Sequence, residues 1–163
     1  MSRKKHYTDP ATKTPWNPSK RAMARVTNPL PAPETCRFCG SDVEIARNSR
    51  VYGGREYGDW PWIYVCTGCE AYVGMHPFTN IPLGTLADQA TRDARKRSKP
   101  AFERLWLSVG APFTRKEAYA ALAERLGIAP KECHFGWFDV EMCERARRAS
   151  LELWDEALME ASR

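Results

Sequence analysis

Two pairs of cysteines are the residues of this chain whose types and spacing best suit chemistry. Cys36 and Cys39 form one C-x-x-C pair, Cys66 and Cys69 form a second, and 26 residues lie between the pairs. Two thiolates at this spacing can bind one metal ion, and two such pairs supply the four sulfur ligands of a tetrahedral zinc site. The spacing therefore predicts one structural Zn²⁺ ion held by all four cysteines.

Disulfide bonding in a secreted protein is the main alternative for these cysteines. The N-terminus lacks the apolar segment of a signal peptide, and no run approaches the roughly 18 apolar residues that a membrane span needs. We therefore expect a cytoplasmic protein with no membrane partner. In that reducing compartment, paired cysteines favour a metal site over disulfides.

A zinc ion bound by four cysteines favours a structural role over catalysis. Catalytic zinc keeps a coordination position open for water, and four protein ligands leave none. The sequence also lacks the glycine-rich phosphate loop, the dinucleotide fingerprint and the serine-hydrolase elbow. Nothing in the sequence requires an enzyme. A zinc-braced nuclease of the histidine–asparagine–histidine kind is the remaining enzymatic alternative, which His76 and Asn80 match only weakly.

Four further residues could take part in metal chemistry. His76 could replace a cysteine ligand or support the site, and together with Cys133, His134 and Cys143 it could form a second site. Adjacent cysteine and histidine side chains suit a single tetrahedral ion poorly, and Cys143 falls on the apolar stripe of a predicted helix. We favour structural roles, with His134 bonded to its loop and both cysteines packed as small apolar groups.

The segment between the cysteine pairs has the pattern of β-strands. Residues 42–45 alternate, residues 62–65 form an apolar run, and glycines between them supply turns. Residues 71–73 follow the second pair as a third strand. These features predict a zinc ribbon over residues 34–78.

The second half of the chain has helical periodicity. The first predicted helix spans residues 86–98, with Thr85 as its N-cap, and a second spans residues 101–109 after a break at Pro100. A third begins at the capping box of Thr114 and Glu117 and ends at Gly127. The last spans residues 139–161. The predicted class is α+β, a small zinc-ribbon β-sheet followed by an α-helical bundle of about four helices. We expect residues 85–161 to pack on the ribbon in one compact domain.

Residues 1–33 form a basic, proline-rich arm. Six prolines predict that no regular element persists there, although residues 20–26 could form a helical turn on a partner. Seven basic residues stand against one acidic residue in the arm, whereas the whole chain carries a net charge of +5. This asymmetry indicates contact with a polyanion or a solubilising arm. Trp16 either packs back onto the domain or stacks on a base or partner.

A second basic cluster spans residues 92–99, with five basic residues against one acidic residue. Cations suit the end of a helix, but five are more than capping needs. In the ribbon, aromatic and arginine side chains could stack on bases and bind phosphates, or cover a thin core. The candidate nucleic-acid-binding residues are Lys4, Lys5, Lys20, Arg21, Arg25, Arg50, Arg55, Arg92, Arg95, Lys96, Arg97 and Lys99.

Several short segments together resemble a known family. They are Cys36-Arg37-Phe38-Cys39-Gly40, Val51-Tyr52-Gly53, residues 65–76, residues 82–87, Ala118-Tyr119 and residues 132–136. This order of segments is similar to a poorly characterised family of zinc-finger-containing proteins found largely in phages, prophages and bacteria. The resemblance implies the four zinc cysteines and roles for His76, Cys133 and His134. It implies no established activity.

Three functional hypotheses follow. The first is a zinc-stabilised, non-enzymatic nucleic-acid-binding protein that is phage-encoded and regulatory. The second is a protein-binding adaptor or an inhibitor of a host transcription or replication machine, which acts in the host cytoplasm. The third is the zinc-braced nuclease.

Overall fold

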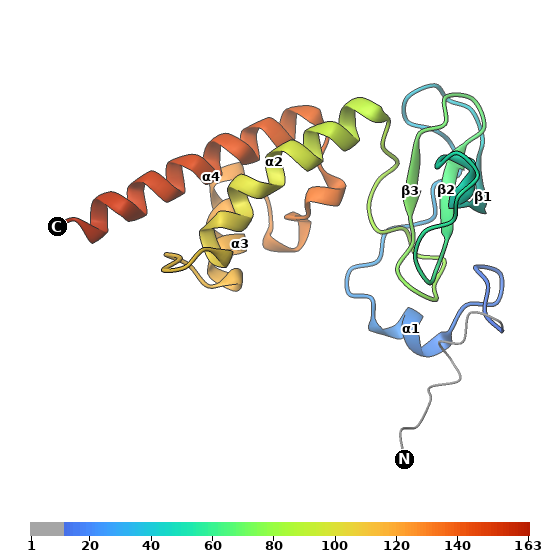
Figure 1. The fold of residues 1–163 in the computed structure, drawn as a ribbon, viewed down its shortest axis with the longest axis horizontal. Helices are drawn as coiled ribbons and strands as arrows, with labels where there is room; N and C mark the ends of the chain where they lie inside the picture. The colour runs from blue at the N-terminus through green and yellow to red at the C-terminus, as the bar shows by residue number, and fades with distance from the viewer. Residues whose placement is uncertain (1–11) are drawn as a thin grey trace, which may run out of the picture. The chain divides into compact units, whose positions relative to one another are not determined.

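The computed structural model describes residues 12–163, and the chain forms two compact units (Figure 1). The ribbon unit ends at Asp88, and the helical unit runs from Gln89 to Arg163. Lys4 and Lys5 lie outside the described residues. The predicted packing of the helical part on the ribbon stays a prediction.

A three-stranded antiparallel sheet is the centre of the ribbon unit. The strands are β1 (Val43–Arg47), β2 (Trp62–Cys66) and β3 (Tyr72–Gly74), in the order β1-β2-β3. In the register of the sheet, Val43 is paired with Cys66 and Arg47 with Trp62. All three predicted strands are confirmed within a few residues of their expected bounds.

The central strand β2 is buried on both faces, as its apolar run predicts. Tyr64 and Cys66 share a face and belong to the core of the ribbon unit. Ile63 and Val65 point to the opposite face and are also buried, at 3% and 0% exposure. The other buried residues of this core are Cys36, Trp60, Ala71, Val73, Met75 and Leu86.

Part of the N-terminal arm has regular structure and packs against the ribbon. Helix α1 (Lys20–Arg25) begins after Ser19, whose hydroxyl accepts a hydrogen bond from the Ala22 amide at 3.2 Å. Ser19 is itself buried, and its amide donates to the Phe78 carbonyl at 2.9 Å. The expectation that no regular element persists in the arm is therefore wrong for these six residues, because the ribbon supplies the partner.

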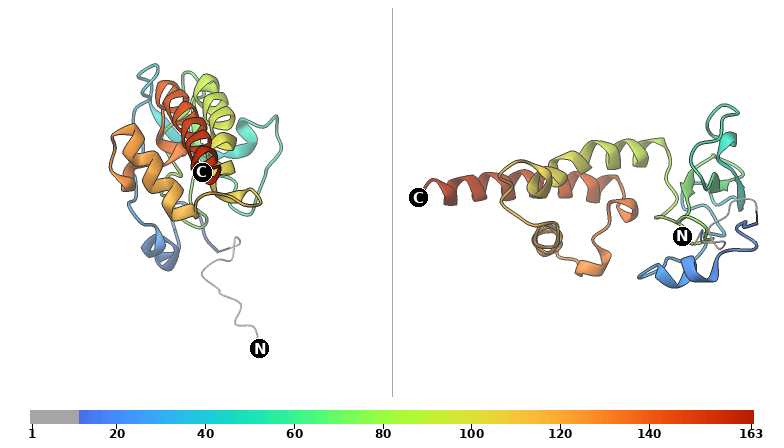
Figure 2. Two further views of the ribbon diagram at one scale, coloured as in Figure 1. Left: turned by 90° about the vertical axis from the view of Figure 1, so that its left-hand side faces the viewer. Right: turned by 60° about the horizontal axis from the view of Figure 1, so that its bottom comes forward.

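The helical unit contains three long helices. They are α2 (Gln89–Leu107), α3 (Arg115–Leu126) and α4 (Val140–Ala161), with 3₁₀ turns η3 (Pro130–Glu132) and η4 (Phe135–Trp137) before α4. Helices α2 and α4 lie side by side and run in the same direction, and α3 packs against both (Figures 1 and 2). The predicted capping box of Thr114 and Glu117 is present, and Gly127 ends α3 with a left-handed φ of 69°.

Helix α2 differs from its prediction at its start and at Pro100. The amide and carbonyl of Ala87 pair with Tyr72, with both N–O distances 3.1 Å, so the chain is extended where a helix was expected. Thr85 is therefore not the N-cap. Pro100 lies inside one continuous helix. An interior proline costs about 3 kcal/mol, but its ring faces solvent, and burial of Phe102 and Leu105 offsets that cost.

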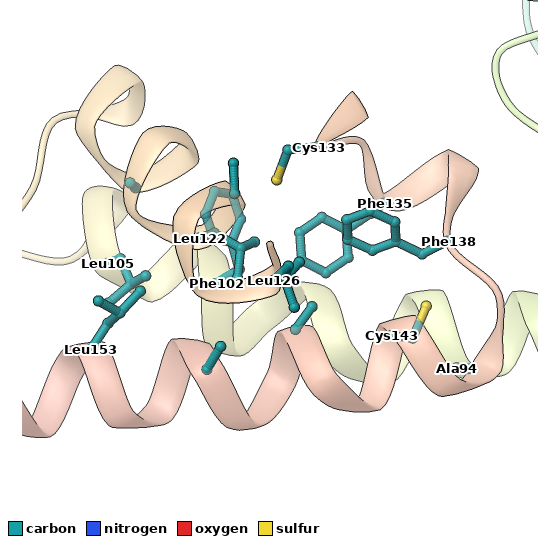
Figure 3. Packing of buried hydrophobic residues seen from close by; sticks show 14 residues of the cluster. Ala94, Phe102, Leu105, Leu122, Leu126, Cys133, Phe135, Phe138, Cys143 and Leu153 are labelled. Carbon is teal, nitrogen blue, oxygen red and sulfur yellow. The ribbon is translucent and has the colours of Figure 1, made fainter. Parts of the chain in front are cut away.

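The core of the helical unit lies where the three helices and η4 meet (Figure 3). Phe102 is fully buried, with its ring centroid 4.7 Å from that of Tyr119 and 5.3 Å from that of Phe135. On α4 the buried stripe includes Leu153, whereas Leu158, further along the helix, is 52% exposed. This difference arises because α4 continues past the end of α2 (Figure 1). No helix among residues 12–163 is long and apolar enough to cross a membrane.

Candidate metal centre

The four predicted zinc ligands converge on one point. The Sγ atoms of Cys36, Cys39, Cys66 and Cys69 all lie within 4.8 Å of one another. The Cys36–Cys69 Sγ distance is 3.6 Å, and the Cys39–Cys66 Sγ distance is 3.4 Å. Four sulfurs around zinc, each bonded at about 2.3 Å, would lie about 3.8 Å apart. The cluster therefore fits one tetrahedral Zn²⁺ ion.

Each cysteine pair lies in a tight turn, or knuckle, and both knuckles have the same hydrogen-bonding design. The Cys36 amide donates to the Ser41 carbonyl at 2.8 Å, and the Cys66 amide donates to the Ala71 carbonyl at 2.8 Å. Both bonds span five residues, so each knuckle closes on itself. The residue after each pair has positive φ, as Gly40 (76°) and Glu70 (61°) show. This conformation turns the chain away directly after the second ligand.

Backbone amides also point at the sulfur atoms of the first cysteine in each pair. The Phe38 amide lies 3.4 Å from Cys36 Sγ, and the Gly68 amide lies 3.3 Å from Cys66 Sγ. Amides in these positions can donate hydrogen bonds to the sulfur of a metal-bound cysteine and orient it toward the ion.

The two knuckles touch at Gly68. A Cβ atom at this position would lie 2.4 Å from the Ser41 hydroxyl oxygen and 3.2 Å from Cys39 Sγ. The Thr67 amide also donates to the Asp42 carbonyl at 2.9 Å, which joins the second knuckle to the start of β1. A glycine is needed at position 68 for this close approach.

The exposed cysteines of the cluster have pKa values displaced in opposite directions. Hydrogen bonds with the side chain and backbone of Ser41 lower the pKa of Cys39 to about 6. A hydrogen bond with the Ala71 backbone lowers the pKa of Cys69. Desolvation and hydrogen bonds with the other three thiols outweigh this effect, and the pKa of Cys69 is raised to about 12. Because four crowded sulfurs repel one another as anions, a bound cation is needed for all to ionise.

The other predicted metal residues do not belong to this cluster. Among residues 12–163, the four cysteines form the one group of three or more histidine, cysteine or acidic side chains that could share an ion. Cys133 and Cys143 are fully buried in the helical core, as the packing alternative predicts. Burial raises the pKa of Cys133 to about 11 and also raises the pKa of Cys143. Both cysteines therefore act as apolar packing groups.

His134 and His76 each contact residues of their own unit. His134 lies in the helical unit, with its ring centroid 4.5 Å from that of Trp137. His76 is half-buried in the ribbon unit, and desolvation lowers its pKa. Its backbone holds the loop that follows, since its carbonyl accepts from the Thr79 hydroxyl at 2.8 Å.

Several of the candidate phosphate-binding residues contact other groups of the protein. Arg95 donates to the Phe138 carbonyl at 2.9 Å, and Lys99 pairs with Glu103 at 3.4 Å. Arg50 forms an ion pair with Glu44. Arg92 donates to Gln89 at 2.8 Å. Within the described chain, Arg92 and Arg95 are half-buried, and the exposed candidates are Lys20, Arg21, Arg25, Arg50, Arg55, Lys96, Arg97 and Lys99.

One arrangement in the ribbon was missed by the sequence interpretation. The guanidinium carbon of Arg47 lies 4.5 Å from the centroid of the Trp62 ring. Arg47 also forms a bidentate ion pair with Glu56, with N–O distances of 2.6 and 2.7 Å. Trp16 also contacts Trp62, edge to face, at a centroid distance of 5.4 Å. The strand register pairs Arg47 with Trp62, and no local sequence signal reveals that register.

Two cysteine knuckles at one end of a three-stranded antiparallel sheet define a zinc ribbon. A family model described as zinc-finger-containing domain, DUF3268, matches residues 32–153. The chain belongs to this family, whose domain covers the ribbon and most of the helical unit. No curated protein and no solved structure matches the chain significantly. The distribution in phages, prophages and bacteria stays a prediction.

Proposed function

We propose that this protein is a non-enzymatic nucleic-acid-binding protein in which zinc braces the binding surface. The observation that carries the proposal is the docked arm, defined as residues 12–25. It presents an exposed aromatic ring and three exposed cations from a fixed position on the ribbon unit. A disordered solubilising arm would need no such attachment.

The attachment of the docked arm is specific. Pro15 is buried, and its carbonyl accepts from the Asn80 side chain at 3.2 Å. Ser19 is 1% exposed and bonds to the Phe78 carbonyl. The two anchors bracket Trp16, which remains 67% exposed. An exposed indole held in place can stack on an unpaired base with little further loss of conformational entropy.

Three cations follow this tryptophan in the docked arm. Lys20, Arg21 and Arg25 are all exposed on α1. An aromatic ring and cations on one segment can bind the bases and the phosphates of a single strand. Zinc contributes indirectly, because it holds the ribbon to which the arm is anchored. As part of the same proposal, the protein is phage-encoded and acts as a regulator in the host cytoplasm.

Fluorescence anisotropy with labelled single-stranded and duplex oligonucleotides tests the proposal on the zinc-loaded full chain. Neutralising all three cations (Lys20→Gln, Arg21→Gln, Arg25→Gln) should lower the slope of log affinity against log salt by about 2–3. Trp16→Ala should weaken single-strand binding by about tenfold and change duplex binding less. A triple variant at Lys116, Lys131 and Arg147 removes the same charge from the helical unit and is the matched control. Equal losses in both triple variants, or no binding at low salt, would refute the proposal.

A protein-binding adaptor or host-machine inhibitor is the second candidate, and an apolar pocket favours it. This pocket of about 230 Å³ lies beside the first knuckle, between residues 30–33 and 84–86, with Arg37 and Thr35 in its lining. Recovery of one stoichiometric protein after nuclease treatment, lost in Leu30→Asp, would support this function. The nuclease alternative has less support, since His76 belongs to no group of potential metal ligands within the described chain.

A further inference from the structure

A small polar pocket lies between the end of α3 and the middle of α4 in the helical unit. Its volume is about 170 Å³. Its lining consists of Arg125, Leu126, Arg145, Arg148, Ala149 and Glu152. Three of these six residues are arginines, and none belongs to the basic residues predicted from the sequence. The pocket is therefore a new candidate site.

Two of the arginines are held in position by their neighbours. Arg125 pairs with Glu152 at 3.2 Å and also with Glu156. Arg145 donates to the Leu126 carbonyl, the last residue of α3, at 3.1 Å. The second bond places a positive group at the negative end of the α3 dipole. Both guanidinium groups are ordered before any ligand arrives, which reduces the entropy lost on binding.

The charge around the pocket favours an anion. Arg148 is exposed, and no ion pair or hydrogen bond engages its side chain among residues 12–163. Glu152 and Glu156 offset two of the three positive charges, so one remains in excess. Three guanidinium groups around one small cavity repel one another, and an anion between them relieves that repulsion.

The type of anion follows from the donors and the space. Guanidinium groups donate in a planar fork that matches the oxygen atoms of phosphate. The pocket is several times larger than the roughly 30 Å³ that a water molecule occupies in the liquid, so a tetrahedral oxyanion fits. We propose that this pocket binds a phosphate group, from a nucleic-acid backbone or from a free phosphorylated molecule. The inference does not depend on the function proposed for the docked arm.

Titration of the zinc-loaded full chain with inorganic phosphate, at constant ionic strength, tests this site by calorimetry and by NMR of the arginine side chains. Arg148→Gln should weaken phosphate binding by about tenfold, the usual effect of losing one charge-assisted hydrogen bond. Arg147→Gln is the matched control. It removes the same charge one residue away, where Arg147 pairs with Glu144 at 3.6 Å and does not line the pocket. The affinity of Arg147→Gln for phosphate should stay within about twofold of that of the wild type.

Glu152→Gln gives a test of opposite sign. Because this carboxylate competes with the ligand for Arg125, its removal should tighten phosphate binding. A purely structural ion pair predicts no such gain. The proposal is overturned if phosphate binding to the wild type is not saturable, or if Arg148→Gln and Arg147→Gln have equal effects.

The same variants then distinguish the source of the phosphate. A parallel loss of oligonucleotide and phosphate binding in Arg148→Gln assigns the pocket to a nucleic-acid backbone. A loss of phosphate binding alone assigns it to a small phosphorylated molecule, and both results support phosphate recognition. Neutralising Lys20, Arg21 and Arg25 should leave phosphate binding unchanged, so the pocket and the docked arm can fail independently.

Discussion

The two units of this protein reach stability by different physical routes. In the ribbon unit, four cysteines converge around a metal site, and a few apolar residues cover a three-stranded sheet. In the helical unit, fourteen buried residues form one apolar cluster beneath capped helices. A small sheet buries too little apolar surface to be stable alone, whereas the helical unit has a larger apolar core. We therefore expect metal dependence in the ribbon unit only.

Removal of zinc gives the largest expected difference between the units. Binding of a structural zinc supplies about 10–16 kcal/mol in small zinc domains, so chelation or Cys66→Ser should unfold the ribbon. The helical unit should remain folded. Far-UV circular dichroism will report retained helix, and limited proteolysis with mass spectrometry will locate cleavage before Asp88. Cys143→Ala, which removes a cysteine from the helical core, is the control and should keep bound zinc. Loss of the helical signal when zinc is removed would contradict the expectation that the two units are stable independently of each other.

Phe102→Ala is the reciprocal test. The ring is fully buried and contacts Tyr119 and Phe135, so its removal leaves a cavity and should cost about 3–5 kcal/mol. Urea unfolding followed by the helical signal will measure this loss, while zinc content should not change. The partly buried Phe113 is the control position, where truncation should cost less. A Phe102 variant that released zinc would show that the ribbon requires the helical unit.

Gly68→Ala tests the contact between the knuckles. The added methyl group would lie 2.4 Å from Ser41 Oγ, so we expect the zinc-loaded ribbon to lose about 1–3 kcal/mol. Competition with a chromogenic chelator will measure the weaker zinc affinity. Gly74→Ala is the control, because its methyl group would meet only the flexible end of Leu83 at 3.2 Å. Adding Ser41→Ala should restore part of the loss, and absence of any rescue would exclude a clash with the Ser41 hydroxyl as the cause.

The smallest expected effect is the acid sensitivity of the α3 cap. Hydrogen bonds from the backbone and side chain of Thr114 lower the pKa of Glu117. A carboxylate with a lowered pKa stabilises the fold above its ordinary value, and this contribution is lost as pH falls through the lower, folded value. Glu117→Gln should therefore differ most from wild type at neutral pH, and the difference should begin to shrink as pH falls below the ordinary glutamate pKa of about 4.3. Urea unfolding of the helical signal across pH will show this, with Glu124→Gln as the control.

Local sequence patterns determined much of both units. The C-x-x-C spacing identifies the ligands, because each pair closes its own knuckle within a few residues. The capping box at Thr114 and the stop at Gly127 were predictable for the same reason, since each depends on neighbours three or four residues away. The start of α2 could not be predicted from local sequence, because Ala87 pairs with Tyr72, fifteen positions earlier in the chain.

The tertiary structure alone decided which surfaces are available for binding. Proline content predicted an irregular arm, but the anchoring of Ser19 to the Phe78 carbonyl makes residues 20–25 a docked helix. The basic cluster at residues 92–99 looked like one surface, and packing engages Arg95 with the Phe138 carbonyl. The pocket of Arg125, Arg145 and Arg148 joins two helices and has no linear signature. Metal ligands follow from spacing, because knuckles are local; recognition surfaces require long-range contacts, because they combine residues from separate elements.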